Sequence, residues 1–405
     1  MGNSMLNDPR DAGRRAVFGA IRKAQRIARV DVARETGISP ATVTAITAEL
    51  IREGLIEETG PSAARSDLRR GRPRVDLKVR GAARVVAGAK LSNQTITVAL
   101  LDFEGTLLGE GRTPLTRTQY SPEEFVPILI EAIEDAVKSS NLTMGDLAGI
   151  GLGLAGIVDA ERGLVYWSPN FSSRNIGLRD LVQHQLDLPV FIDNDANLVA
   201  MAEQFFGHGR GVSDFIVITI ESGVGMGIVI DNEIYRGTGG RGAEFGHTKV
   251  QLDGALCRCG QRGCLEAYVA DYALLREATT TTDLTDADTA AERLQLLFDA
   301  AKNGDTTAKS ILDRAGRMFA MGLANMVNVF DPKLIILSGE RMQADFLYAE
   351  DVIANLEKSI VQIDMPPPEV KIHKWGDLMW AKGAGAYAIA GVADLALQRI
   401  TENAV

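Results

Sequence analysis

The stretch GAEFGHTKVQLDGALCRCGQRGCLEAY, residues 242–268, contains all three cysteines of the 405-residue chain and one of its four histidines. The potential ligands are His247, Cys257, Cys259 and Cys264. One imidazole and three thiolates form a donor set that structural zinc accepts, and the glycines between them permit the tight turns that ligands so close in sequence require. Three buried cysteines beside a separate histidine are the alternative, and a disulfide fits poorly because three is an odd number. We therefore expect one structural zinc ion.

The same stretch carries a family resemblance. EFGH at residues 244–247, followed by CRCGQRGCLE at residues 257–266, resembles the signature of the ROK family, named for its repressors, open reading frames and sugar kinases. The resemblance extends from Asp11 to about Val392. It implies an α/β body with the two-lobed actin-like sugar kinase fold of the ASKHA, or ribonuclease H-like, class, in which the zinc loop shapes a sugar pocket.

Composition and charge indicate more than one domain. With 46% hydrophobic residues the chain can bury a large core, and its length suits two or three domains. It contains no apolar run long enough to span a membrane and no recognisable signal peptide, so we expect a cytoplasmic protein. Residues 1–80 carry a net charge of +6 and the remainder −16. This asymmetry favours a nucleic-acid-binding module at the front of an acidic body.

The first 80 residues have the pattern of a winged helix-turn-helix. Helical apolar spacing runs from Asp11 to about Ile27, Gly37 is placed to end a second helix, and Pro40 takes the first turn of a third. The residues of the third helix expected to meet DNA are Ser39 at its N-cap and Ala41, Thr42 and Thr44 near its start, because small side chains approach base edges closely in a major groove. A helical hairpin that never meets DNA is the alternative.

An arginine-rich segment follows in the expected wing. The sequence RRGRPR occupies residues 69–74, and its proline favours an extended backbone. Such a segment can place Arg69, Arg70 and Arg72 in a narrow minor groove. A solvated basic linker is the alternative, and the resemblance to ROK repressors favours the DNA-binding interpretation.

Beyond residue 80, strands and helices alternate, as is typical of an α/β body. We expect a first lobe over residues 81–200, a second lobe with the zinc loop over residues 201–378, and a final helix near 379–400 that returns to the first lobe. The last feature is implied by the family resemblance.

The resemblance also implies a sugar site. IDNDAN, residues 192–197, ends a strand and opens a helix, and here Asn194 matches a sugar ligand and Asp195 the general base of ROK kinases. The remaining residues implied for sugar binding are Gly156, Asn170, Glu244, His247 and Glu266, with His247 contacting both metal and sugar. Simple helix capping by the polar residues of IDNDAN is the alternative.

The first hairpin of the body departs from the kinase pattern. Kinases of the family carry Asp-x-Gly-Gly-Thr in its turn, whereas this chain has KLSNQ at residues 90–94. Lys90 replaces the acidic residue that helps to hold the metal ion in the kinases. The side chains of Ser92 and Asn93 fill space that the backbone and a phosphate group would share. We expect no catalytic residue and regard Asp195 as a vestigial base. The glycine-rich loop at residues 222–227 is a weak nucleotide signal.

These features predict a sugar-responsive transcriptional regulator, most simply a repressor of carbohydrate uptake or catabolism genes. Its expected partners are a double-stranded DNA operator and a small sugar or sugar-phosphate effector. A homodimer or homotetramer is expected, because paired heads read a roughly palindromic operator, and closure of the lobes would change the spacing of the heads. The alternatives are an active sugar kinase with a DNA-binding appendage and a protein controlled by a transport-system protein.

Overall fold

The computed structural model describes residues 9–60, 75–279, 288–339, 350–361, 366–374, 376 and 378–402. The chain forms two compact units, and it passes between them at Asn194/Asp195 and again at Met379/Trp380. The predicted lobe boundary near residue 200 thus lies at Asp195. The winged helix, expected as residues 1–80, belongs to the same unit as the first lobe. No described helix is long and apolar enough to cross a membrane.

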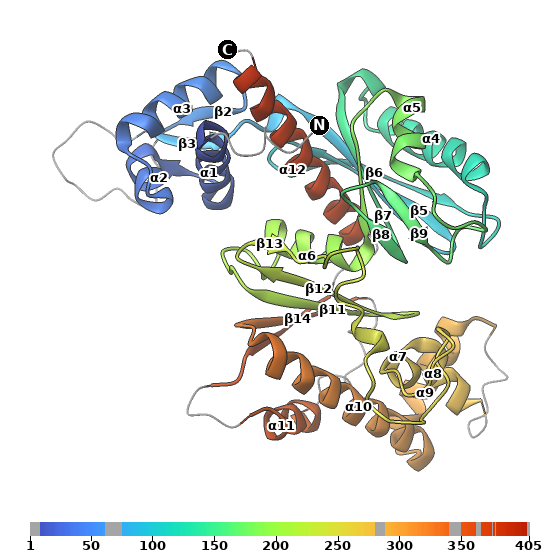
Figure 1. Ribbon diagram of the computed structural model, residues 1–405. Coiled ribbons are helices and arrows are strands. Elements are labelled where there is room, and N and C mark those ends of the chain that lie inside the picture. Colours follow the sequence, from blue (N-terminus) through green and yellow to red (C-terminus); the bar gives the residue numbers. More distant parts are fainter. Residues whose placement is uncertain are drawn as a thin grey trace. The chain divides into compact units, whose positions relative to one another are not determined.

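The first unit begins with the winged helix (Figure 1). Its elements are α1 (Pro9–Ala24), β1 (Ile27–Ala28), α2 (Arg29–Thr36), α3 (Pro40–Arg52), β2 (Ile56–Thr59) and β3 (Asp76–Val79). The strands form a sheet in the order β1-β3-β2. The first helix ends three residues before the predicted Ile27, because Gln25 adopts a positive φ of 61° and the chain then enters β1. The helix-turn-helix is otherwise as predicted, with Gly37 in the left-handed region and Ser39 at the N-cap of α3.

The lobe of this unit is built on a five-stranded sheet in the order β10-β7-β4-β5-β6. Its strands are β4 (Val85–Leu91), β5 (Thr95–Asp102), β6 (Leu107–Pro114), β7 (Leu147–Leu154) and β10 (Val190–Asn194). A small hairpin, β8 (Ile157–Asp159) and β9 (Leu164–Trp167), accompanies α4 (Pro122–Ser139) and α5 (Leu178–Leu186). The apolar sides of α4 and α5 bury a core against the sheet.

The last helix, α12 (Leu378–Glu402), crosses the other side of this sheet. It packs at backbone distance because glycines face it: a Cβ on Gly88 would lie 2.0 Å from the Ala381 carbonyl oxygen, and one on Gly151 1.8 Å from that of Ala384. From Trp380 onward this helix belongs to the first compact unit. The helix continues two residues beyond the predicted residue 400, and the first of these, Thr401, contacts α1.

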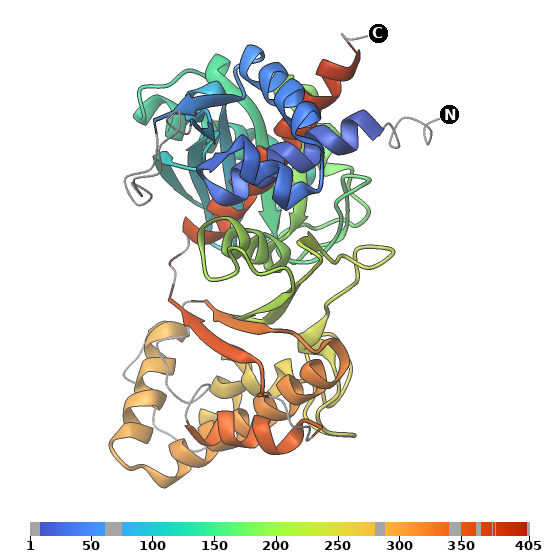
Figure 2. The same ribbon diagram turned by 90° about the vertical axis from the view of Figure 1, so that its left-hand side faces the viewer.

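The second unit is a five-stranded sheet in the order β13-β12-β11-β14-β15 with helices on both faces (Figure 2). Its strands are β11 (Phe215–Ile220), β12 (Val224–Ile230), β13 (Glu233–Ile234), β14 (Leu334–Ser338) and β15 (Glu369–His373). One face carries α6 (Asp195–Phe206); the other carries α7 (Glu266–Val269), α8 (Asp271–Ala278), α9 (Ala290–Lys302), α10 (Thr306–Phe330) and α11 (Glu350–Ser359). Strand β12 reaches α6 closely, since a Cβ on Gly227 would lie 2.6 Å from the Ala196 carbonyl oxygen. The loop that contains the four predicted metal ligands connects β13 to α7.

Candidate functional site

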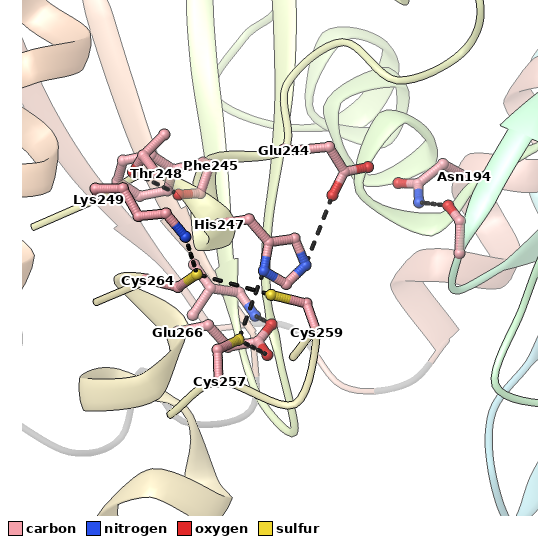
Figure 3. Close-up of polar contacts among 12 residues, drawn as sticks. Asn194, Glu244, Phe245, His247, Thr248, Lys249, Cys257, Cys259, Cys264 and Glu266 are labelled. Carbon is pink, nitrogen blue, oxygen red and sulfur yellow. Dashed lines mark hydrogen bonds and ion pairs between the residues drawn. The ribbon is translucent and has the colours of Figure 1, made fainter. Parts of the chain in front are cut away.

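The four predicted metal ligands lie together in the second unit (Figure 3). Their ligand atoms all fall within 4.8 Å of one another, with His247 Nδ1 3.7 Å from Cys257 Sγ and Cys259 Sγ 3.7 Å from Cys264 Sγ. Gly263 lets the loop close, because it has a φ of 76° and a Cβ there would lie 1.7 Å from the Gln251 carbonyl oxygen.

The spacing of these atoms fits a tetrahedral zinc ion. Zinc–sulfur bonds of about 2.3 Å place two thiolates about 3.8 Å apart around a tetrahedral ion, close to the observed separation of Cys259 and Cys264. A disulfide between those two residues would need about 2.05 Å. Burial raises the pKa of the Cys257 thiol, so a metal ion would have to displace its proton. The donor set and its geometry therefore fit zinc in a structural role.

Lys249 and Tyr272 also contact the thiols. Lys249 Nζ donates to Cys264 Sγ at 2.9 Å and to Gln261 Oε1 at 2.7 Å, and the Tyr272 hydroxyl donates to Cys257 Sγ at 3.6 Å. A zinc ion with three thiolates and one imidazole carries a net charge of −1, which the lysine ammonium offsets. The hydrogen bond to Cys264 raises the pKa of Lys249. Neither Lys249 nor Tyr272 was predicted to lie at this site, because both contacts depend on how the loop folds.

Glu244 lies beside the histidine of the metal cluster. His247 Nε2, the nitrogen turned away from Cys257, lies 3.9 Å from Glu244 Oε2. Burial raises the pKa of Glu244; His247 opposes this, whereas the nearby charges of Asp195 and Glu266 add to it. Asp195, His247 and Glu266, all residues of the second unit, thus each act electrostatically on Glu244.

Glu266 connects the metal loop with the glycine-rich loop. Its Oε2 accepts the Val224 backbone N–H at 3.3 Å, and its Oε1 lies 3.6 Å from Cys257 Sγ and 3.4 Å from the Tyr272 hydroxyl. Asp195 begins α6, within the segment 192–197 that was predicted to open a helix, and its carboxylate accepts the Ala196 N–H at 2.9 Å. Asp195 therefore makes a capping-type contact as well as interacting with Glu244.

The other predicted sugar residues belong to the first unit. The Asn194 side-chain amide donates to the Gly156 carbonyl oxygen at 2.7 Å. Gly156 has a φ of 126°, and a Cβ there would lie 2.1 Å from the Trp167 carbonyl oxygen, so glycine is required. Asn170 is only 2% exposed, and its amide donates to the Ser92 carbonyl oxygen at 3.0 Å. The amide group of Asn170 thus supports the turn of the first hairpin.

That turn is closed by its own side chains. Ser92 Oγ accepts the Thr95 N–H at 3.0 Å and donates to the Thr95 carbonyl oxygen at 2.9 Å. Lys90 is 5% exposed, and its Nζ lies 3.8 Å from the centre of the Trp380 ring. The lysine is therefore buried against α12, and the serine hydroxyl occupies hydrogen-bonding positions within the turn.

The exposed face of α3 is made of small side chains. Its exposed residues before Arg52 are Pro40, Ala41, Thr42, Thr44, Ala45 and Ala48. The Thr44 hydroxyl donates to the Pro40 carbonyl oxygen at 2.8 Å, and those of Thr42 and Ser39 share a hydrogen bond of 2.8 Å. Ser39 Oγ also accepts the Thr42 N–H at 3.2 Å. The wing arginines Arg69, Arg70 and Arg72 lie outside the described residues.

Sequence comparison identifies the family. The ROK family profile matches residues 87–398, most of the chain. The chain belongs to the ROK family. A profile for winged helix-turn-helix DNA-binding domains matches residues 11–57, so both the predicted family and the predicted fold are confirmed.

Known proteins similar to this chain include a repressor, a transcriptional regulator and a kinase. The xylose repressor of Caldicellulosiruptor bescii is 32% identical over 321 residues, covering 78% of this chain and 79% of the repressor. The crystal structure of a ROK family transcriptional regulator, a homologue of the E. coli MLC protein, has 26% identity and a TM-score of 0.81, covering 97% of this chain and 99% of the regulator. A ROK family glucokinase from Streptomyces griseus, solved with glucose and AMPPNP, has 29% identity and a TM-score of 0.64, covering 76% of this chain and all of the kinase.

Proposed function

We propose that this ROK protein is a sugar-responsive DNA-binding regulator, most simply a repressor of carbohydrate uptake or catabolism genes. The observation that carries the proposal is that a DNA-binding winged helix forms one compact unit with the ROK lobe and α12. The relative named xylose repressor and the structurally similar transcriptional regulator support this class of function. Binding as a homodimer or homotetramer to a roughly palindromic operator would suit a winged helix.

In this proposal the body binds the effector, a small sugar or sugar phosphate. Carboxylates and amides accept and donate the hydrogen bonds that sugar hydroxyls offer, and the second unit presents Asp195, Glu244 and Glu266 beside His247. Zinc held by the cysteines and His247 Nδ1 would fix the imidazole so that Nε2 faces Glu244 and the sugar. In the first unit Asn194 and Gly156 would supply further polar groups, with Asn170 supporting the adjacent turn.

We further propose that phosphoryl transfer is lost. A kinase turn needs an acid for the metal and free backbone N–H groups for phosphate, whereas here Lys90 is buried against Trp380 and Ser92 fills the turn. The second candidate is an active sugar kinase, which Asp195 and the similarity to a glucokinase favour. In the proposed regulator, by contrast, the sugar would act by binding two states of the body with different affinities.

A thermal-shift screen with and without ATP tests both candidates. Xylose, glucose, N-acetylglucosamine and their phosphates should be screened, because a ligand that binds the folded state raises its apparent stability. We expect one of them to raise the melting temperature without ATP. A coupled ATP-hydrolysis assay should then show no sugar-dependent turnover. Robust turnover by the unmodified protein would instead establish the kinase.

A further inference from the structure

Helix α1 contains two charged residues that are almost fully buried. Asp11 is 7% exposed and Arg14 5% exposed, and charged side chains are rarely buried without partners. Arg14 Nε donates to Glu49 Oε2 of α3 at 2.9 Å, and its Nη1 donates to Thr401 Oγ1 of α12 at 3.1 Å. Asp11 accepts the Thr401 hydroxyl and lies 3.6 Å from the Arg14 guanidinium. Arg14 thus joins the recognition helix to the last helix of the body.

These contacts fix the position of α3 relative to α12 more than they stabilise the fold. A buried ion pair stabilises a fold little more than apolar residues of the same shape would. The planar guanidinium, in contrast, directs its donors along fixed lines, so α3 and α12 can both bind it only in one relative position. An electrostatic interaction between the same two helices accompanies these contacts: partial desolvation raises the pKa of Asp394 of α12, an exposed residue, and the positive charges of Arg15 and Arg22 of α1 oppose that shift.

Helix α12 connects this cluster with the point where the chain re-enters the first unit. Its 25 residues, Leu378–Glu402, extend about 37 Å, with Trp380 in the first turn and Thr401 in the last. Glycines hold its backbone directly against strands β4 and β7, and the Trp380 ring packs on Lys90. A helix held so closely moves with its sheet as a rigid element. A displacement at its first turn would therefore reach Thr401.

We propose that Arg14 is a positioning residue that fixes the recognition helix α3 in register with α12, so that the ligand state of the body changes the affinity of the winged helix for DNA. The inference rests on the proposed function and specifies how its two sites are coupled. Coupling requires an element that both ligands influence, and the chain of contacts from Thr401 through Arg14 to Glu49 supplies one.

The test measures the ratio of DNA dissociation constants of the full-length protein with and without sugar. The DNA is a duplex selected from a random library by the unmodified protein, and the sugar is the panel member with the largest thermal shift. Thr401→Val removes the hydroxyl and keeps the shape of the side chain, and Thr401→Ser restores the hydroxyl. We expect the ratio to fall at least about fivefold towards one in Thr401→Val, because coupling is typically 5- to 150-fold. Thr401→Ser should keep the ratio of the unmodified protein.

Two further variants separate positioning from stability. Arg14→Lys keeps the charge but cannot bridge Glu49 and Thr401, so it should also lose the sugar response while still binding sugar. Arg117→Ala breaks an exposed ion pair with Glu124 and should leave the ratio unchanged. An unchanged ratio in Thr401→Val and Arg14→Lys would overturn the inference. Absence of any sugar response in the unmodified protein would overturn the proposed function itself.

Discussion

Methyl groups of α3 should contribute to its reading of DNA, and Thr44 offers a direct test. Its hydroxyl is bound to the Pro40 carbonyl oxygen, so the methyl group is the part of this exposed side chain left to meet a base. The helix has no lysine, arginine, asparagine or glutamine before Arg52, the residues that usually read guanine and adenine. Thymine, which carries a methyl group in the major groove, is the base that such a surface would favour.

The variants Thr44→Ser and Thr44→Val separate the two groups. Serine keeps the hydroxyl bond and removes the methyl, whereas valine keeps a methyl and removes the hydroxyl. Burying one methyl group contributes about 0.8 kcal/mol, so Thr44→Ser should weaken binding about fourfold and Thr44→Val should bind like the unmodified protein.

Fluorescence anisotropy with two duplexes measures this difference. One duplex is the selected sequence, and the other carries deoxyuridine for each thymine, which removes the major-groove methyls and leaves the minor-groove edges unchanged. The unmodified protein should bind the thymine duplex about fourfold more tightly per contacted methyl. At the one thymine that Thr44 contacts, the affinity of Thr44→Ser should not change when deoxyuridine replaces thymine. If Thr44→Val loses affinity while Thr44→Ser does not, the hydroxyl is the reading group and the reasoning is wrong.

Three other predictions concern the metal, the effector and the wing. Purified protein should contain one zinc ion per chain by mass spectrometry. Cys259→Ser should lower both the metal content and the sugar response, whereas the control Tyr272→Phe should keep the metal. Full sugar binding by protein without zinc would contradict the metal assignment. Asp195→Asn should remove the sugar-induced thermal shift, since a lost hydrogen bond to a charged group amounts to about 1.5–3 kcal/mol, and exposed Asp187→Asn is the control; a retained shift would exclude Asp195 as a ligand. DNA binding should weaken steeply with salt, and Arg72→Ala should lower the salt slope by about one unit and weaken binding most on A/T-rich flanks; an unchanged slope would place Arg72 away from phosphate.

The metal cluster was predictable because its information is local. The spacing of Cys257, Cys259 and Cys264 on a glycine-rich loop limits how far apart the sulfurs can lie, and the structure brings them within reach of His247. The contact of Lys249 with Cys264 was not predictable, since it depends on an isolated bridge between the backbones of these two residues.

Contacts between distant segments could not be predicted from the sequence. Arg14 and Thr401 are separated by 387 positions, and nothing in either local sequence indicates that α12 extends far enough to meet α1. The helix-turn-helix and the alternation of strands and helices in the body were predicted, because apolar periodicity and turn residues mark them. The short strand β1 was missed, because it exists only through its pairing with β3.

For the predicted sugar residues, the sequence indicated some of the relationships seen in the structure and missed others. The resemblance pointed to Glu244, Glu266 and Asp195, and the structure places their charges close to one another. The same reasoning selected Asn170 without indicating that its amide would bind the turn at Ser92, a contact between segments 78 residues apart. Which of these side chains bind a sugar stays a prediction.

The most direct test of the account is a titration of sugar into the complex of the full-length protein with its selected duplex, in the absence of ATP. We expect one sugar of the panel to change the DNA dissociation constant by at least about fivefold, with no phosphorylated sugar formed when ATP and magnesium are then added. A protein that phosphorylates the sugar while its affinity for DNA stays constant would contradict the account.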